Sequence, residues 1–232
     1  MPHHLPTETG DYKNRQTVLV FEESLPSHIP SDAILFNRRY STPNCITRNC
    51  YFHENRARGV ICNSGGCLIE GNRFYHNQHA AIHLTADMET AWGEGFGARN
   101  VIVRNNTIDS PNCCGAYNGA ALLVAAGVYG SATHYPLLEN LLLENNRFQE
   151  TTGPVILAMS FQNLVVRNNT VINKGKPPIA LKMRGGIYAE LGRGLWVESN
   201  TWTTQKDFVQ PNLSYDPDST PKVVCRGNQL KN

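Results

Sequence analysis

The chain has 232 residues, 41% of them hydrophobic and 17% charged, with a formal net charge of +2. That is enough chain to bury a core within one domain, and a near-neutral balance without a basic stripe argues against binding to nucleic acid or to an anionic membrane. No run of about 18 apolar residues occurs, so the sequence predicts no membrane-spanning segment.

The first part of the chain, residues 1–44, differs from the rest because it lacks the repeat described below. We interpret it as a non-repeat lead-in to a single repeat domain over residues 45–232. The start has no basic segment followed by an apolar one, so no secretory signal is visible. A cytoplasmic protein and a mature form of an exported protein both remain open, and the localisation is unknown.

A short motif ending in asparagine recurs from residue 46 onward. Each copy has an apolar residue three positions before the asparagine and another apolar residue two positions after it. The asparagines lie 23 to 40 residues apart, at Asn49, Asn72, Asn106, Asn146, Asn169, Asn200 and Asn228. A constant motif with variable spacing indicates equivalent coils that carry loops of different length.

These repeats predict an all-β protein, a right-handed parallel β-helix of about seven coils with an asparagine ladder. A single coil cannot bury its own apolar face and needs neighbours above and below. Asparagine tolerates the left-handed backbone of a tight bend, and its amide can pair with the same residue in the next coil. We expect each such rung to contribute on the order of 1 kcal/mol.

A row of charges supports the stacking. The residues two before the ladder position alternate in sign along the chain, in the order Glu70, Arg104, Glu144, Arg167, Glu198 and Arg226. We interpret them as an outer ladder of ion pairs, in which each exposed pair contributes ~0–1 kcal/mol. This interpretation removes the three glutamates from the catalytic candidates. An apolar row two residues further back, from Leu68 to Val224, is predicted to face outward as well.

A further strand is expected in several coils, at 59–62, 80–84, 119–124, 153–157 and 178–181. Long loops follow it at 85–99, 125–139 and 182–194. Loops that leave one edge of a rigid stack are where such a fold would place a binding cleft.

The seven cysteines are an odd number and show neither a C-x-x-C pair nor a zinc-type spacing with histidine. We expect reduced thiols that act as small apolar fillers, with a disulfide framework as the weaker alternative. No metal site and no cofactor are predicted.

The segment 80–97 contains the densest group of residues suited to chemistry: His83, Asp87, Glu89, Trp92 and Glu94, interspersed with glycines. Paired carboxylates beside an indole ring are typical of sugar chemistry, in which one acid protonates the leaving oxygen and the other activates water. On composition alone, an ordinary polar loop is an equally good interpretation.

The stretches Arg56-Ala-Arg-Gly59, Ile69-Glu-Gly-Asn72, Ala80 to Asp87, Trp92-Gly-Glu-Gly95 and Val103 to Ile108 resemble glycoside hydrolase family 110. Members are inverting α-1,3-galactosidases built on a β-helix, and the likeness covers only their C-terminal half. The resemblance implies Asp87 as a catalytic carboxylate and Glu94 and Trp92 as residues of the substrate cleft. From the residues themselves we expect Glu94 to share acid/base roles with Asp87. We also expect substrate contacts from His83, Glu89, Arg56 and Arg58, with the two arginines alternating along a strand.

The sequence departs from the family pattern in one place that matters. The family has an acidic residue at the end of the strand in the coil after the aspartate, whereas this chain has Leu122-Leu-Val-Ala-Ala-Gly127. An inverting enzyme needs an acid and a base about 6.5–9.5 Å apart. Glu94 or Glu89 would then have to supply the second carboxylate.

Three functions therefore remain open. The first is a glycosidase that hydrolyses terminal α-linked galactose on an oligosaccharide or glycan. The second is a non-catalytic or truncated carbohydrate-binding β-helix. The third is a calcium-dependent polysaccharide lyase of the pectate-lyase type, for which only Asp87 and Glu89 resemble a calcium cluster. The oligomeric state is unknown.

Overall fold

The computed structural model describes residues 20–29, 41–88, 93–116, 119–128, 131–175, 179–204 and 213–231, with the backbone alone at 87, 93, 94 and 204. The chain divides into two compact units, Met1–Leu35 and Phe36–Asn232. In the first unit, residues 20–29 contain a turn in which the Ile29 amide donates to the Pro26 carbonyl. Every described strand belongs to the second unit.

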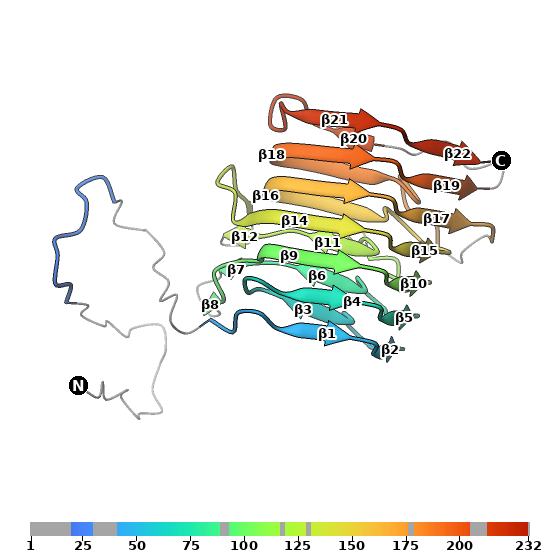
Figure 1. The fold of residues 1–232 in the computed structure, drawn as a ribbon, viewed down its shortest axis with the longest axis horizontal. Coiled ribbons are helices and arrows are strands. Elements are labelled where there is room, and N and C mark those ends of the chain that lie inside the picture. The colour runs from blue at the N-terminus through green and yellow to red at the C-terminus, as the bar shows by residue number, and fades with distance from the viewer. Residues whose placement is uncertain are drawn as a thin grey trace. The chain divides into compact units, whose positions relative to one another are not determined.

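The second unit is a parallel β-helix whose strands stack as rungs on three faces (Figure 1). The first face contains β3 (Val60–Cys62), β6 (Ile82–Leu84), β11 (Leu122–Val124), the first halves of β16 (Ile156–Arg167) and β18 (Ile187–Glu198), and β20 (Leu213–Tyr215). The second face contains β1 (Ile46–Arg48), β4 (Leu68–Glu70), β9 (Arg99–Arg104), β14 (Leu138–Glu144), the second halves of β16 and β18, and β21 (Val223–Arg226).

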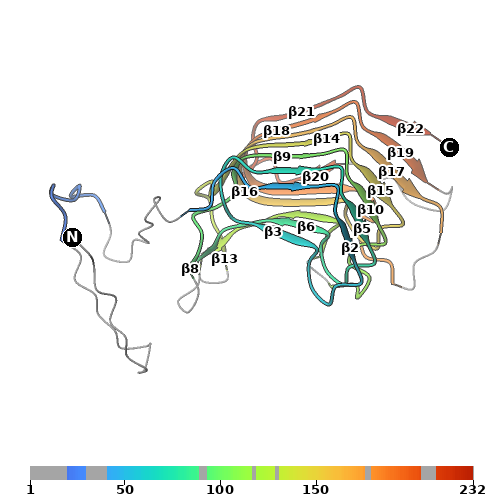
Figure 2. The same ribbon diagram turned by 60° about the horizontal axis from the view of Figure 1, so that its bottom comes forward.

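The third face contains β2 (Tyr51–His53), β5 (Arg73–Tyr75), β10 (Thr107–Asp109), β15 (Arg147–Gln149), β17 (Thr170–Asn173), β19 (Thr201–Thr204) and β22 (Gln229–Lys231). Figure 2 shows how the chain bends sharply from the second face into the third. All pairs within these three faces are parallel. The described residues contain no helix, and therefore none long and apolar enough to cross a membrane.

Two strands connect the first face directly to the second. β16 and β18 each run through both faces for twelve residues and bend where Ser160 and Leu191 adopt positive φ angles of 55° and 52°. The predicted strand at 178–181 and the predicted loop at 182–194 are therefore wrong. The described residues 179–186 form a turn, and the strand begins only at Ile187.

The asparagine ladder is confirmed from Asn72 to Asn228, but the predicted first member, Asn49, is wrong because the first coil contributes a cysteine. Ile46 pairs with Leu68, so Cys50, not Asn49, stacks on Asn72, and Phe52 rather than Tyr51 stacks on Phe74. The Cys50 amide donates to Asn72 Oδ1 at 2.9 Å.

The left-handed conformation was predicted for the ladder asparagines, whereas the structure places it at the residue before each. The positive φ angles belong to Asn49, Gly71, Asn105, Asn145, Asn168, Ser199 and Gly227. The reason is that the ladder side chain must turn into the stack, which leaves the tight bend to its neighbour.

The charge row is also confirmed, and it extends by one residue. Glu70 contacts Arg104 Nε at 2.6 Å and Arg48 Nε at 2.7 Å. The contact with the Arg104 guanidinium holds the pKa of the Glu70 carboxyl below its usual range. Further pairs join Arg167 to Glu144 and Arg226 to Glu198, both at 2.8 Å. The apolar row before it, from Leu68 to Val224, is half-buried.

The core runs through the centre of the stack and is almost entirely apolar. Its members alternate along the short strands with outward residues, as period-two patterning requires. The largest fully buried side chains are Phe74, Phe148, Phe161, Ile69, Ile82, Leu84, Ile108, Leu122, Leu138, Leu141, Leu143 and Ile156. Of the cysteines, all free, only Cys62 and Cys67 are buried as the filler prediction requires, whereas Cys45, Cys50, Cys114 and Cys225 are exposed.

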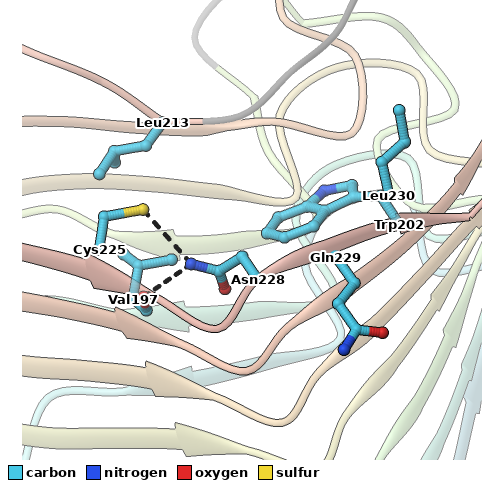
Figure 3. Close-up of a pocket in the computed structure, with 7 residues that line it drawn as sticks. All are labelled: Val197, Trp202, Leu213, Cys225, Asn228, Gln229 and Leu230. Carbon is cyan, nitrogen blue, oxygen red and sulfur yellow. Dashed lines mark hydrogen bonds between the residues drawn. The ribbon is translucent and has the colours of Figure 1, made fainter.

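The last described coil has an apolar hollow of about 270 Å³ (Figure 3), lined by Val197, Trp202, Leu213, Cys225, Asn228, Gln229 and Leu230. Asn228 Nδ2 donates to the Val197 carbonyl at 2.8 Å and to Cys225 Sγ at 3.3 Å. The hollow is the top of the core, and its lining includes no ionisable group except the Cys225 thiol.

Candidate functional site

Two small β-hairpins leave the stack where strands of the first face end (Figure 1). The first pairs β7 (Asp87–Met88) with β8 (Gly93–Glu94), and the second pairs β12 (Gly127–Val128) with β13 (Ser131–Ala132), both antiparallel. β7 also pairs with β12 in parallel, so the hairpins of consecutive coils form one four-stranded sheet. The loops predicted at 85–99 and 125–139 are thus structured at their bases.

The register of the first hairpin brings the two predicted catalytic residues together. Asp87 lies directly opposite Glu94, and Met88 lies opposite Gly93. Directly opposite residues of an antiparallel pair have Cβ atoms ~4.5–5.5 Å apart. Seven positions separate these residues in the sequence, and only the hairpin makes them neighbours.

The base of this hairpin is held by a buried side chain and a backbone hydrogen bond. Met88 is buried at 6% exposure, and the Ala98 amide closes the loop by donating to the Thr85 carbonyl at 3.2 Å. Gly97 has a φ angle of 107°, and a Cβ atom there would overlap the Leu137 carbonyl oxygen of the next coil. Glycine is therefore required where the chain returns from the hairpin to the stack.

The position that stacks on Asp87 in the next coil is Gly127. The segment 125–127, which lacks an acidic residue, therefore belongs to the coil directly adjacent to Asp87. Glu94, across the hairpin, is the carboxylate that the register places next to Asp87.

His83 lies in the middle of β6, between Ile61 of β3 and Leu123 of β11. Its neighbours Ile82 and Leu84 face the core, so alternation places His83 on the outer side of the first face. It is nevertheless only 6% exposed. His83 is thus a covered residue, four positions before Asp87.

The other predicted substrate-binding residues are not gathered at the hairpin. Arg56 and Arg58 are exposed in the turn before β3, so their predicted alternation along a strand is wrong. That turn leads into the first face, whereas the hairpins leave from its far end. Glu89 and Trp92 lie outside the described residues, and their predicted roles stay predictions.

A polar cluster that sequence reasoning missed lies on the first face, three rungs from β6. Tyr188 donates from its hydroxyl to Glu190 Oε2 at 2.9 Å, which raises the pKa of the Tyr188 phenol. The Asp216 amide donates to the Ala189 carbonyl, so Asp216 lies beside Glu190 in the next coil. Three rungs of stacked strands place the cluster ~14 Å from β6. The sequence signal for this cluster is the alternation of apolar and polar residues in Ile187-Tyr-Ala-Glu190. The loop predicted at 182–194 included these residues, so the strand was missed.

The described side chains include no group of three or more His, Cys, Asp or Glu residues arranged to hold a metal ion. The side chains of Asp87, Glu89 and Glu94 are outside that description.

A family model described as "Right handed beta helix region" matches residues 33–210. The chain belongs to this right-handed β-helix family. The match supplies the handedness of the stack and confirms the predicted fold class.

The chain is also similar to curated α-1,3-galactosidases, which confirms the resemblance noted from the sequence. It is 29% identical over 157 residues to α-1,3-galactosidase A of Bacteroides fragilis, covering 66% of this chain and 25% of the relative. It is 30% identical over 202 residues to α-1,3-galactosidase B of Akkermansia muciniphila, covering 82% and 25%. For α-1,3-galactosidase B of Bacteroides thetaiotaomicron the identity is 27% over 150 residues, covering 64% and 24%.

The chain thus spans about a quarter of the length of the curated relatives it matches. It is a glycosidase-like β-helix protein by sequence and fold.

Proposed function

We propose that this β-helix acts on glycans by hydrolysing a terminal α-linked galactose, with Asp87 and Glu94 as the acid/base pair. The observation that carries the proposal is the register of the hairpin, in which the two carboxylate residues are direct partners. The similarity to α-1,3-galactosidases supports the choice of sugar. One carboxyl group would protonate the leaving oxygen, and the other would activate water on the opposite side of the sugar.

The surroundings favour such a pair. The hairpin is anchored by buried residues on the stack of strands. Such a base holds catalytic groups more exactly than a free loop would. Inversion needs carboxyl groups about 6.5–9.5 Å apart, and retention needs ~5–5.5 Å. We propose inversion, which is the outcome that the resemblance to glycoside hydrolase family 110 implies.

The direct test is galactose release from p-nitrophenyl α-galactoside and from an α-1,3-linked galactosyl oligosaccharide, with and without EDTA. Asp87→Asn and Glu94→Gln should each lower turnover by about a hundredfold or more. Asp109→Asn is the matched control, because Asp109 lies on the third face and accepts from the Ser110 hydroxyl at 2.9 Å. It should keep full turnover. Equal losses in all three variants would exclude a specific role for the hairpin.

A non-catalytic sugar-binding β-helix is the second candidate, and one observation favours it. Asp87 stacks on Gly127, so the adjacent coil contributes no carboxylate. In that case the folded parent would bind an α-galactosyl oligosaccharide without turning it over, and Asp87→Asn would weaken binding only.

If the parent is active, proton NMR of the first-formed sugar anomer would decide between inversion and retention.

A further inference from the structure

A second asparagine ladder runs up the outside of the stack, at the start of the second face. Asn163 Nδ2 donates to Asn140 Oδ1 at 3.0 Å, and Asn140 Nδ2 donates to Asn100 Oδ1 at 3.0 Å. All three residues are exposed and have positive φ angles of 53° to 55°. Each lies six residues before a ladder asparagine of the core, at Asn106, Asn146 and Asn169.

This outer ladder stops above a glycine. The position below Asn100 is Gly66, whose φ angle is 70° and whose amide donates to the Arg99 carbonyl at 2.8 Å. The orientation of the ladder directs Asn100 Nδ2 toward this rung. No described residue accepts a hydrogen bond from that nitrogen.

The next rung down supplies an acceptor that faces the gap. A Cβ atom added at Gly66 would overlap Asn44 Oδ1, so the Asn44 amide oxygen already extends beside the glycine. The Asn44 oxygen thus lies where a side chain of residue 66 would begin, on the rung toward which Asn100 Nδ2 is directed. A ligand hydroxyl group can accept a hydrogen bond from Asn100 Nδ2 and donate one to Asn44 Oδ1 at the same time.

The gap opens into a cavity of about 390 Å³ lined by Pro43, Asn44, Gly65, Gly66, Phe96, Arg99, Asn100 and Glu139. Sites for small molecules commonly have volumes in this range. Arg99 Nη1 contacts Glu139 Oε2 at 3.3 Å, and the guanidinium lies 5.8 Å from the centre of the Phe96 ring. Arg99 Nε is buried and has no hydrogen-bond partner among the described residues.

The chemistry of this lining selects a neutral ligand rich in hydroxyl groups. The Arg99–Glu139 pair balances its own charge, so it offers fixed donors and acceptors without attracting a charged ligand. Phe96 adds an apolar surface beside them, as sites for amphipathic rings require. We propose that the cavity beneath Asn100 binds a sugar residue in its pyranose form, with one ring hydroxyl bridging Asn100 and Asn44.

This site is separate from the proposed acid/base pair and does not depend on it. Phe96 is the one lining residue close in sequence to the hairpin, two positions after Glu94. The cavity would be a binding subsite, and the sugar held in it would not be the one whose glycosidic bond is cleaved. It adds a recognition function that exists whether or not the chain hydrolyses glycans.

The test is titration of the full chain with methyl α-D-galactopyranoside and methyl α-D-glucopyranoside, followed by NMR saturation transfer and calorimetry. Tetrahydropyran-2-methanol serves as a ring that lacks the ring hydroxyls. We expect saturable binding of at least one glycoside, with Kd on the order of 1 mM as for small ligands with few contacts. The control ring should not saturate. Absence of saturation by both glycosides in the folded parent would overturn the proposal.

Three variants locate the binding. Asn100→Gly keeps the backbone conformation and removes the donor, so it should weaken binding by about tenfold. Asn163→Gly makes the same change at the far end of the ladder, outside the cavity, and should change Kd by less than about twofold. Gly66→Asn should abolish binding, because asparagine tolerates a positive φ and its side chain would fill the gap and push the Asn44 side chain aside. Equal weakening by Asn100→Gly and Asn163→Gly, or full binding by Gly66→Asn, would refute the site.

Circular dichroism of each variant confirms that the fold is intact. Asp87→Asn separates this proposal from the proposed hydrolysis: binding that survives in that variant belongs to the cavity, whereas binding lost in it belongs to the hairpin and would overturn the subsite. An inactive parent whose binding still depends on Asn100 would remove the hydrolase and leave the subsite standing.

Discussion

Asn146 accepts two hydrogen bonds from Asn106 through a single oxygen. Asn106 N and Asn106 Nδ2 both donate to Asn146 Oδ1, at 3.1 and 3.0 Å. Asn146 Nδ2 in turn donates to Asn169 Oδ1 and to the Val103 carbonyl. Every polar atom of a buried amide is thus used within the stack, and the same arrangement recurs from coil to coil.

Asn146→Ala should therefore destabilise the protein by about 3 kcal/mol, because two buried donors of Asn106 lose their acceptor. Urea unfolding measures the change. Asn140→Gly, in the exposed outer ladder, is the control and should cost less than about 1 kcal/mol, since water replaces the lost bonds. Equal costs would contradict the assignment of stability to the inner ladder.

Gly192→Ala should be strongly destabilising. Gly192 pairs with Phe161, and a Cβ atom at Gly192 would overlap the ring of that fully buried side chain. Overpacking of this kind costs ~1–3 kcal/mol. Gly65→Ala is the comparison, because a Cβ there meets only the Arg99 carbonyl at 3.4 Å. Thermal melts of the two variants should differ by several degrees, with Gly192→Ala the lower.

Arg184 ties the turn at 179–186 to the coil below. Its Nε donates to the Thr151 carbonyl, and its Nη2 contacts Glu150 Oε2 at 3.3 Å. Burial lowers the pKa of the Arg184 guanidinium, and Glu150 partly offsets that shift.

Arg184→Met should consequently speed hydrogen exchange in 179–186 while leaving the inner ladder protected. Glu150→Gln is a milder change, because glutamine keeps one oxygen that can accept from one of the Lys174 and Gly175 amides, which Glu150 accepts with separate oxygens. It should perturb exchange less. Unchanged exchange in Arg184→Met would show that the turn is held by other contacts.

Burial raises the pKa of the Cys62 thiol to about 12 from 9.0. The folded state therefore favours the neutral thiol, and this stability is fully present below pH 9.0. It is lost progressively as the pH rises from about 9 toward 12, because the unfolded chain ionises first. The melting temperature should thus fall less steeply above pH 9 in Cys62→Ala than in the parent. Cys114→Ala, at an exposed thiol, should retain the parent's slope.

The repeat and the inner ladder could be predicted from the sequence because each coil repeats a local motif with fixed spacing to its asparagine. The charge row followed from the same motif. The start of the ladder could not, since Asn49 fits the pattern and only the pairing of Ile46 with Leu68 shows that Cys50 takes the ladder position. The outer ladder also has a sequence signal, because three coils have an asparagine six residues before the inner one.

The repeated motif is sufficient to predict a stack of equivalent β-coils, because burial of the apolar positions requires neighbours above and below. Which side chains meet between coils and across loops depends on the three-dimensional arrangement. Asp87 opposes Glu94 because a hairpin closes between them, and Asn100 faces Asn44 because the intervening rung is a glycine. Such encounters depend on the register of hydrogen bonds between strands, which the repeated motif does not encode.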